Sequence, residues 1–214
     1  MGELRDIPTV GRYRLRSSGL LAEVRHPLLD MWVLEEIFRF RVYEPPAPVS
    51  RALAALERPV RILDLGGHVG FFAMFMRGLL PDPSIVSFEP DPRNFDSLRR
   101  CIEANGLEQR WRAIQACAAT ADGTAAFQSS FHLSRIAAPA DDSLGEFQSR
   151  VGGAFPFLQG TSLLSAERRE VACRDVFPFL AEADLVKIDI EGAEWAILAD
   201  HRFAELEAVA LVLE

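Results

Sequence analysis

Short apolar runs alternate with stretches of helical periodicity from residue 60 to the end of the chain. The apolar runs are bounded by glycine, proline or aspartate, as is typical of buried strands. They predict strands at 60–65, 84–88, 113–118, 184–190 and 209–213. The stretches between them predict helices at 71–80, 93–105 and 193–199. Strands that alternate with helices in this way favour an α/β fold with a mainly parallel sheet covered on both faces.

The first 58 residues lack this alternation, so we expect an N-terminal helical lead-in at 1–58 and a single domain at 59–214. Within the domain, residues 128–170 are rich in Ser, Gly, Ala and Phe without a clean period. Long irregular stretches inside compact domains often serve as lids, so this segment predicts either a lid or a set of short helices over the sheet edge.

The lead-in itself contains one segment of near-helical spacing, 28–40, which the proline-rich segment 43–48 ends. Ser50 is expected to cap a second, short helix at 51–57. The side chains of the first helix expected to pack against the domain are Trp32, Ile37 and Phe38.

Composition and charge narrow the class of protein. Of the 214 residues, 49% are apolar and 25% are charged, which is ordinary for a globular enzyme. The formal net charge of -8 makes nucleic acid an unfavourable partner. Because no apolar run approaches a membrane span and no apolar signal core opens the chain, we expect a cytoplasmic protein with no membrane span. The three cysteines form no C-x-x-C pair and indicate reduced thiols rather than a zinc site.

The turn after the first predicted strand has the composition of a ligand-binding loop. Gly66, Gly67 and Gly70 allow a sharp turn and a close approach of a ligand to the backbone. Their spacing differs from the i, i+2, i+5 glycines of dinucleotide-binding loops. Asp64 suits a cationic ligand, either directly or through water, and His68 is expected either to face the ligand or to satisfy backbone groups. The alternative is a tight strand–helix turn with no ligand.

The second predicted strand ends in Glu89, about 20 residues after Gly66. A carboxylate at this place can accept hydrogen bonds from both hydroxyls of a ribose. Pro90 and Pro92 end the strand and fix the turn. Together with the glycine turn, Glu89 predicts a ligand that contains a nucleoside. The alternative is an acidic cluster that caps the next helix.

Two later strand ends add candidate residues. Ala118 is small enough to leave room for an adenine ring, although small core residues are common. In the fourth strand, alternation places Lys187, Asp189 and Glu191 on one side. A lysine inside an apolar strand requires a nearby carboxylate. The two acids are candidates to orient an acceptor hydroxyl or to hold the amino acid end of a sulfonium ligand; the alternative is a structural ion pair.

Four segments in this order resemble the FkbM-type methyltransferases, and the most specific of them reads Lys-Ile-Asp-Ile-Glu-Gly-Ala-Glu. The segments are 62–72, 87–95, 104–106 and 185–194. The resemblance implies a Rossmann-like class I methyltransferase fold. It also implies methyl transfer to a small-molecule hydroxyl acceptor, such as a sugar, a polyketide or another secondary metabolite.

The resemblance implies further that S-adenosylmethionine is the cofactor and that the loop from Asp64 to Gly70 binds it together with Glu89. Attack by an alcohol on the methyl group requires a base within hydrogen-bond reach. Asp189 is the first candidate, held by Lys187, and Glu191 and His68 are alternatives, with His132 a weaker one. No histidine or cysteine spacing supports a metal site.

Compared with the family, the sheet is expected to lack its last two strands, which leaves the edge of the fifth strand open. An open apolar edge favours aggregation unless something covers it, so a homodimer or the N-terminal segment is a candidate cover. Two other functions remain open. One is a NAD-dependent Rossmann oxidoreductase, and the other is a truncated, non-catalytic nucleoside-binding or assembly protein.

Overall fold

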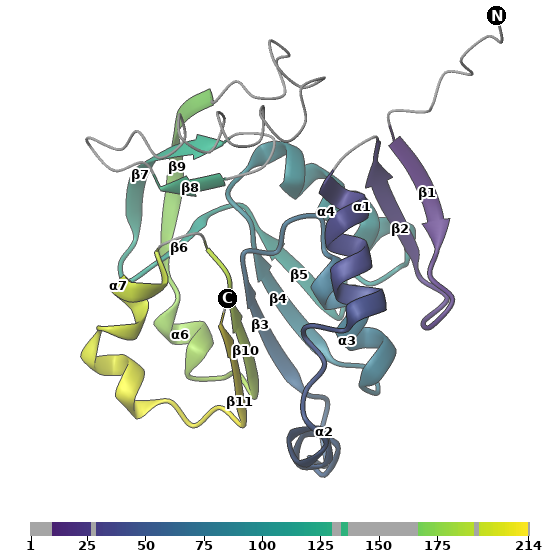
Figure 1. Ribbon diagram of the computed structural model, residues 1–214. Helices are drawn as coiled ribbons and strands as arrows, with labels where there is room; N and C mark the ends of the chain where they lie inside the picture. Colours follow the sequence, from purple (N-terminus) through teal and green to yellow (C-terminus); the bar gives the residue numbers. More distant parts are fainter. Residues whose placement is uncertain (1–9, 27–28, 130–133, 137–166, 191–192, 214) are drawn as a thin grey trace, which may run out of the picture.

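A five-stranded parallel sheet forms the centre of the computed structural model, which describes residues 10–26, 29–129, 134–136, 167–190 and 193–213 (Figure 1). The order across the sheet is β11-β10-β3-β4-β5. The bounds are Arg61–Leu65 for β3, Ser84–Phe88 for β4, Trp111–Ile114 for β5, Leu185–Ile188 for β10 and Ala210–Leu213 for β11. All four pairings are parallel, which confirms the expected sheet and gathers the carboxyl ends of the strands at one edge.

The alternation of side chains divides each strand between two hydrophobic cores. One face packs against α3 (Phe71–Leu79) and α4 (Pro92–Ala104), and the other against α6 (Phe177–Leu180) and α7 (Glu194–Leu198). The strand residues on the first face are Ile62, Ile85 and Leu185. Two positions further along each strand, the same face carries Asp64, Ser87 and Lys187. The apolar core therefore gives way to a polar cluster where the strands end.

A second, smaller sheet begins where β5 ends, with strand order β6-β9-β7-β8 (Figure 1, upper left). Its bounds are Cys117–Ala119 for β6, Gly123–Ser129 for β7, Ser134–Ile136 for β8 and Glu167–Asp175 for β9. The sequence predicted one strand at 113–118, which is wrong. The Ala116 N–H donates to the Ile114 carbonyl at 3.0 Å, a turn that separates β5 from β6.

The described part of the N-terminal region begins with a β-hairpin, which the expectation of a helical lead-in did not include. Strands β1 (Val10–Arg14) and β2 (Leu21–Arg25) pair antiparallel. The apolar pattern does not indicate them because four of the five residues of β1 are exposed. The helical segments that follow are α1 (Leu29–Glu35), the π-helix η1 (Glu36–Phe40) and α2 (Ala47–Ala54).

Two details of these helices differ from expectation. Ile37 is buried and the Phe38 ring packs edge-on against Phe75, as expected, but Trp32 is 66% exposed. Helix α2 begins three residues before Ser50, whose hydroxyl donates to the Pro45 carbonyl at 3.0 Å instead of capping the helix.

Strand β11 is at one edge of the central sheet, as expected for the fifth strand. Helix α7 and the 3-10 helix η4 (His201–Glu205) precede it. Within the described residues no strand pairs with its outer side, and Leu211 and Leu213 are 43% and 49% exposed. Among the described residues, no helix is long and apolar enough to span a membrane.

Asp184 holds the starts of three central strands together. Its carboxylate accepts from both terminal nitrogens of Arg58, at 2.6 and 2.7 Å, and from the Arg61 N–H at 2.8 Å. Its carbonyl accepts from the N–H groups of Val209 and Ala210, just before and at the start of β11. Burial alone would raise the pKa of Asp184, but the donors from Arg58 and Arg61 outweigh burial and lower this pKa to about 2.

We expect Asp184→Asn to reduce the free energy of unfolding by about 1–2 kcal/mol at pH 7, with a smaller loss at pH 3. A carboxyl whose pKa is lowered by folding stabilises the protein above its unfolded pKa near 4, and this contribution is lost as the pH falls towards 2. Urea unfolding at pH 7 and pH 3 measures the difference, with Asp96→Asn, an exposed carboxyl on α4, as control. An equal loss at both pH values would contradict the assignment.

Candidate functional site

The loop after β3 makes a tight turn at the carboxyl edge of the sheet. Gly66, His68 and Gly70 all have positive φ, at 87°, 47° and 94°. The N–H groups of Gly66 and Gly67 both donate to the Phe88 carbonyl at the end of β4, at 3.0 and 2.7 Å. The glycines are therefore needed for backbone conformation and for the close contact between these two strand ends.

Two of these glycines also leave no space for a side chain. A Cβ on Gly66 would lie 1.8 Å from the carbonyl oxygen of Asp189, and a Cβ on Gly70 would lie 2.7 Å from the ring of Trp111. The loop after β3 therefore packs directly on the backbone after β10. The candidate carboxylate of Asp189 thus lies beside the glycine loop.

Asp64, Ser87 and Lys187 form the polar cluster beneath the loop. Asp64 is fully buried, and its Oδ2 accepts from the Ser87 hydroxyl at 2.9 Å. Ser87 in turn accepts from the indole N–H of Trp111 at 3.0 Å. Asp64 Oδ1 has no hydrogen-bond partner in the described part of the chain, and it faces Lys187 Nζ at 3.4 Å. Burial raises the pKa of Asp64, and the positive charge of Lys187 partly offsets this effect.

Lys187 lies between two carboxylates, which confirms the partner expected from the sequence. Its Nζ is 3.4 Å from Asp64 Oδ1, 3.2 Å from Asp189 Oδ2, and donates to the Gly66 carbonyl at 2.8 Å. The rings of Tyr43 and Phe72 each lie 5.7 Å from the ammonium. Burial alone would lower the pKa of Lys187, but Asp64 and Asp189 outweigh it and raise this pKa, so the side chain is charged.

Asp189 is the accessible member of this group, with 30% of its side chain exposed. The Tyr43 hydroxyl donates to its Oδ2 at 3.4 Å. One oxygen of Asp189 therefore faces Lys187 and Tyr43, which fixes the orientation of the carboxylate, and no residue in the described part of the chain donates to the other oxygen. A carboxylate held in this way can accept a proton from a group placed at the sheet edge.

Glu89 connects the end of β4 with the glycine loop. It is 4% exposed, and its two oxygens accept from the N–H groups of His68 and Asp91, each at 2.8 Å. Asn94 Nδ2 lies 3.4 Å from the same carboxylate. Burial raises the pKa of Glu89 to about 8, against the opposing effect of these donors.

His68 is held by residues of the N-terminal region. Its Nε2 lies 3.2 Å from an Arg25 nitrogen and 3.7 Å from Asp30 Oδ1. A guanidinium only donates, so Nε2 accepts and the ring proton is on Nδ1. Burial lowers the pKa of His68 to about 4, although Asp30 opposes this effect. The imidazole is therefore neutral at physiological pH.

The other predicted residues fall in different places. Pro90 follows β4 and is half-buried, and Asp91 caps α4 by accepting from the N–H groups of Arg93 and Asn94. Ala118 belongs to β6 of the second sheet, so its expected position at the end of the third central strand is wrong. Glu191, His132 and most of the segment 128–170 lie outside the described residues. No group of three or more potential metal ligands occurs among the described residues.

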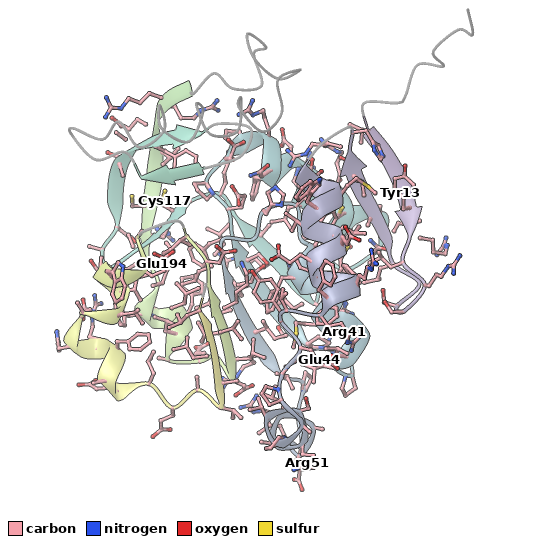
Figure 2. The ribbon with its side chains drawn as sticks, in the orientation of Figure 1. Tyr13, Arg41, Glu44, Arg51, Cys117 and Glu194 are labelled. Carbon is pink, nitrogen blue, oxygen red and sulfur yellow. The ribbon has the colours of Figure 1, made fainter. Side chains whose placement is uncertain are left out.

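Three contributors to the site were not identified from the sequence: Arg25, Asp30 and Tyr43. All three precede the first glycine turn by more than 20 residues and belong to no recognisable motif. Figure 2 shows the side chains of the described residues, with Tyr13 on the N-terminal hairpin at one side of the molecule and Cys117 on the second sheet at the other. Long-range contacts of this kind leave no local pattern in the sequence.

Comparison with known proteins places residues 64–214 in the family described as methyltransferase FkbM domain. Among curated relatives, "Methyltransferase sdnD" of Sordaria araneosa is 26% identical over 181 residues, which cover 78% of this chain and 67% of the relative. "Methyltransferase 1" of Beauveria bassiana is 26% identical over 142 residues, covering 64% of this chain and 56% of the relative.

Among solved structures, a SAM-dependent methyltransferase from Agrobacterium tumefaciens aligns with a TM-score of 0.44 at 11% identity, covering 88% of this chain and 42% of that one. The chain thus spans less than half of that protein and about 56% to 67% of the two curated relatives. The family match confirms the resemblance found in the sequence and, at the level of the family, the S-adenosylmethionine cofactor that it implied. This chain belongs to the FkbM methyltransferase domain family.

Proposed function

We propose that this chain binds S-adenosylmethionine at the carboxyl ends of β3 and β4 and transfers its methyl group to a hydroxyl of a small molecule. The observation that carries the proposal is the joint placement of three groups at one sheet edge. These are the glycine loop, the Glu89 carboxylate bonded to that loop, and the Asp189 carboxylate packed against it. Membership of the FkbM family supports the same reaction.

The residues present suit the chemistry of this cofactor. Each oxygen of a carboxylate has two lone pairs, so Glu89 retains acceptor capacity for the vicinal hydroxyls of a ribose beyond its bonds to His68 and Asp91. Gly66 and Gly67 present backbone without side chains, and the loop leads into the amino end of α3, which carries a partial positive charge. The nearby carboxylate of Asp189 suits an ammonium or sulfonium group. We assign Gly66, Gly67 and Glu89, with Asp64 and Gly70 as supports of the loop, to cofactor binding, and keep Asp189 as an alternative ligand of the cofactor's ammonium group.

When bound, the cofactor supplies an electrophilic methyl group on a sulfonium, and the thioether that remains after transfer is a good leaving group. The residues of the chain must align the acceptor and take up its proton. Alignment alone supplies roughly 7–11 kcal/mol in well-oriented systems. Asp189 is the base we favour because its carboxylate is partly exposed and oriented by Lys187 and Tyr43. Glu191 remains an alternative base. His68 is less suited, because Arg25 occupies its Nε2.

The acceptor class follows from this assignment. An alcohol loses its proton during attack, and a carboxylate held at the sheet edge fits that need. We therefore propose O-methylation, and the resemblance to the FkbM family implies a sugar, polyketide or other secondary metabolite as the acceptor. A reducing compartment such as the cytoplasm suits the three buried free thiols. The outer side of β11, with which no described strand pairs, suits a homodimer.

The test is binding of S-adenosylhomocysteine, the demethylated product, compared with binding of NAD. A ligand that binds only the folded state raises the melting temperature, so we expect a shift with S-adenosylhomocysteine and none with NAD. A shift with NAD alone would indicate a dinucleotide-dependent oxidoreductase instead. Binding of S-adenosylhomocysteine without methyl transfer to any hydroxyl compound would favour a non-catalytic nucleoside-binding protein.

Glu89→Gln is expected to weaken S-adenosylhomocysteine binding on the order of tenfold at pH 8.5, because a charged acceptor is lost. In the wild type, the pKa of Glu89 near 8 means that affinity rises between pH 6.5 and pH 8.5 as the carboxyl ionises and can accept both hydroxyls. Calorimetry at these two pH values measures both effects, and the pH dependence should disappear in the variant. Equal affinity of both proteins at both pH values would remove Glu89 from the ribose site.

A further inference from the structure

We infer that Arg25, from the N-terminal hairpin, is a positioning residue of the cofactor site: it fixes the His68 ring and the Asn94 amide, and Glu89 accepts from the backbone N–H of His68 and from the Asn94 side chain. The inference rests on the proposed function, because it assigns a role in cofactor binding. It goes further in one respect. Arg25 lies outside the matched family region, which begins at residue 64.

The guanidinium of Arg25 contacts three elements at once. Its Nε and one terminal nitrogen donate to the two oxygens of Asp30, at 2.9 and 2.7 Å. The same terminal nitrogen lies 3.2 Å from His68 Nε2, and the other terminal nitrogen donates to Asn94 Oδ1 at 2.9 Å. Asp30 is 2% exposed, so the bidentate pair is anchored in the protein interior. Arg25 therefore links β2, α1, the glycine loop and α4.

Besides Asp30, Arg25 contacts Asn94 and His68, and both of these residues donate to Glu89. The Asn94 amide receives Arg25 on its oxygen, which turns its NH2 group towards Glu89 Oε1 at 3.4 Å. On the other side, the backbone N–H of His68 donates to Glu89 Oε2, while the ring of His68 accepts from Arg25. Arg25 thus sets the position of the groups on both sides of the carboxylate without touching it.

The contacts between the hairpin and α4 place Arg25 next to His68 and Asn94. Leu21 exchanges two hydrogen bonds with the Asn105 side chain, at 2.8 and 2.9 Å, next to the carboxyl end of α4. Glu23 is 6% exposed and accepts from Arg100 Nε at 2.9 Å, further along the same helix. Arg25 then reaches the amino end of α4, where Glu89 precedes the helix. Figure 1 shows the hairpin beside α4.

A lysine or a neutral residue does not reproduce this arrangement. The planar guanidinium offers five donors in a fixed fork, and here it serves two carboxylate oxygens, an amide oxygen and an imidazole nitrogen. An ammonium at this position pairs with Asp30 but does not reach Asn94 and His68 together. The contacts also fix the tautomer of His68, whose surroundings are Arg25, Asp30, Lys187 and Asp189.

The test compares Arg25→Ala and Arg25→Lys with wild type. Binding of S-adenosylhomocysteine, measured by calorimetry, should weaken on the order of tenfold in both variants, because neither side chain can hold the Asn94 amide and the His68 ring together. Asn94→Ala should weaken binding in the same direction. Arg12→Ala is the matched control: Arg12 lies on the same hairpin, is 62% exposed and is 3.9 Å from Glu23, so affinity should not change.

A second readout separates positioning from general stability. In the wild type His68 should remain neutral down to a pH near its lowered pKa of about 4. In Arg25→Ala, Asp30 loses its cation and faces the imidazole, so the pKa of His68 should rise above about 4, although burial still lowers it. Two-dimensional NMR of the imidazole signals measures this, with His68→Gln to assign the resonance.

The outcomes are distinguishable. If wild type binds S-adenosylhomocysteine and Arg25→Lys and Asn94→Ala bind it equally well, the positioning role is overturned and the proposed function stands. A lower melting temperature in Arg25→Ala with unchanged affinity and unchanged His68 titration would overturn it too. If folded wild type does not bind S-adenosylhomocysteine, the proposed function fails and this role fails with it.

Discussion

Lys187→Met should destabilise the protein by about 3–5 kcal/mol at pH 7, because it removes the cation that lies between the carboxylates of Asp64 and Asp189. Lys187 is the only lysine in the sequence, in which all other residues of the Lys and Arg class are arginines. A compact ammonium with three donors fits between Asp64, Asp189 and the Gly66 carbonyl, where a planar guanidinium does not.

The destabilisation should depend on pH in a definite direction. Without Lys187, burial keeps the pKa of Asp64 above its unfolded value. A group whose pKa is raised by folding stabilises the protein below its unfolded pKa, and this contribution is lost as the pH rises. The variant should therefore lose stability between pH 4 and pH 7.

Urea unfolding across that range measures the loss, and two further variants make the result interpretable. Asp64→Asn combined with Lys187→Met should recover much of the stability, because no charge is then left buried beside Ser87. Arg99→Met, which removes an exposed cation from α4, should cost less than about 1 kcal/mol. If Lys187→Met unfolds at the wild-type urea concentration at every pH, the buried charge cluster is not what holds the strand ends together.

The central sheet was predictable because its signal is local. Four of its strands, β3, β4, β10 and β11, are short apolar runs next to a turn, and Ser84–Phe88 matches its predicted range residue for residue. Gly106 follows α4 in the left-handed conformation, at φ 63°, which a glycine at a helix end favours. Such features depend on a few neighbouring residues, so the sequence contains them in full.

The errors occur where neighbours in sequence do not determine the structure. The strand predicted at 113–118 divides between two sheets because its small residues are compatible with both, and only the pairing of β6 with β9 separates them. The hairpin at 10–25 was missed because β1 is mostly exposed and has no apolar face to reveal it. In both cases the deciding contacts are made with distant parts of the chain.

The residues of the candidate site likewise fall into those with a local signal in the sequence and those without one. Asp64, Glu89, Lys187 and Asp189 were found because each ends a strand, and in parallel sheets strand ends are where ligands bind. Arg25, Asp30 and Tyr43 were missed because they reach the site through the docking of the N-terminal region. Their effect on the site is to orient groups that the motifs supply, as with Tyr43 and Asp189.

Asp189→Asn should reduce methyl transfer by roughly 10²–10⁴-fold, because the acceptor hydroxyl then has no base of sufficient strength within reach. The amide has nearly the same shape as the carboxylate, and its oxygen still accepts from Lys187 and the Tyr43 hydroxyl. Affinity for S-adenosylhomocysteine should therefore be retained while kcat falls.

The measurement is conversion of S-adenosylmethionine to S-adenosylhomocysteine in the presence of a panel of small hydroxyl compounds. Tyr43→Phe should lower kcat less, because its 3.4 Å contact orients Asp189 without taking the proton. Asp96→Asn, on an exposed face of α4, should match wild type. Wild-type turnover in Asp189→Asn would exclude Asp189 as the base, and Glu191→Gln would then be the variant that loses activity. Loss of turnover together with loss of cofactor affinity would show instead that Asp189 binds the cofactor, because a group that acts only in the transition state lowers kcat and leaves cofactor affinity unchanged.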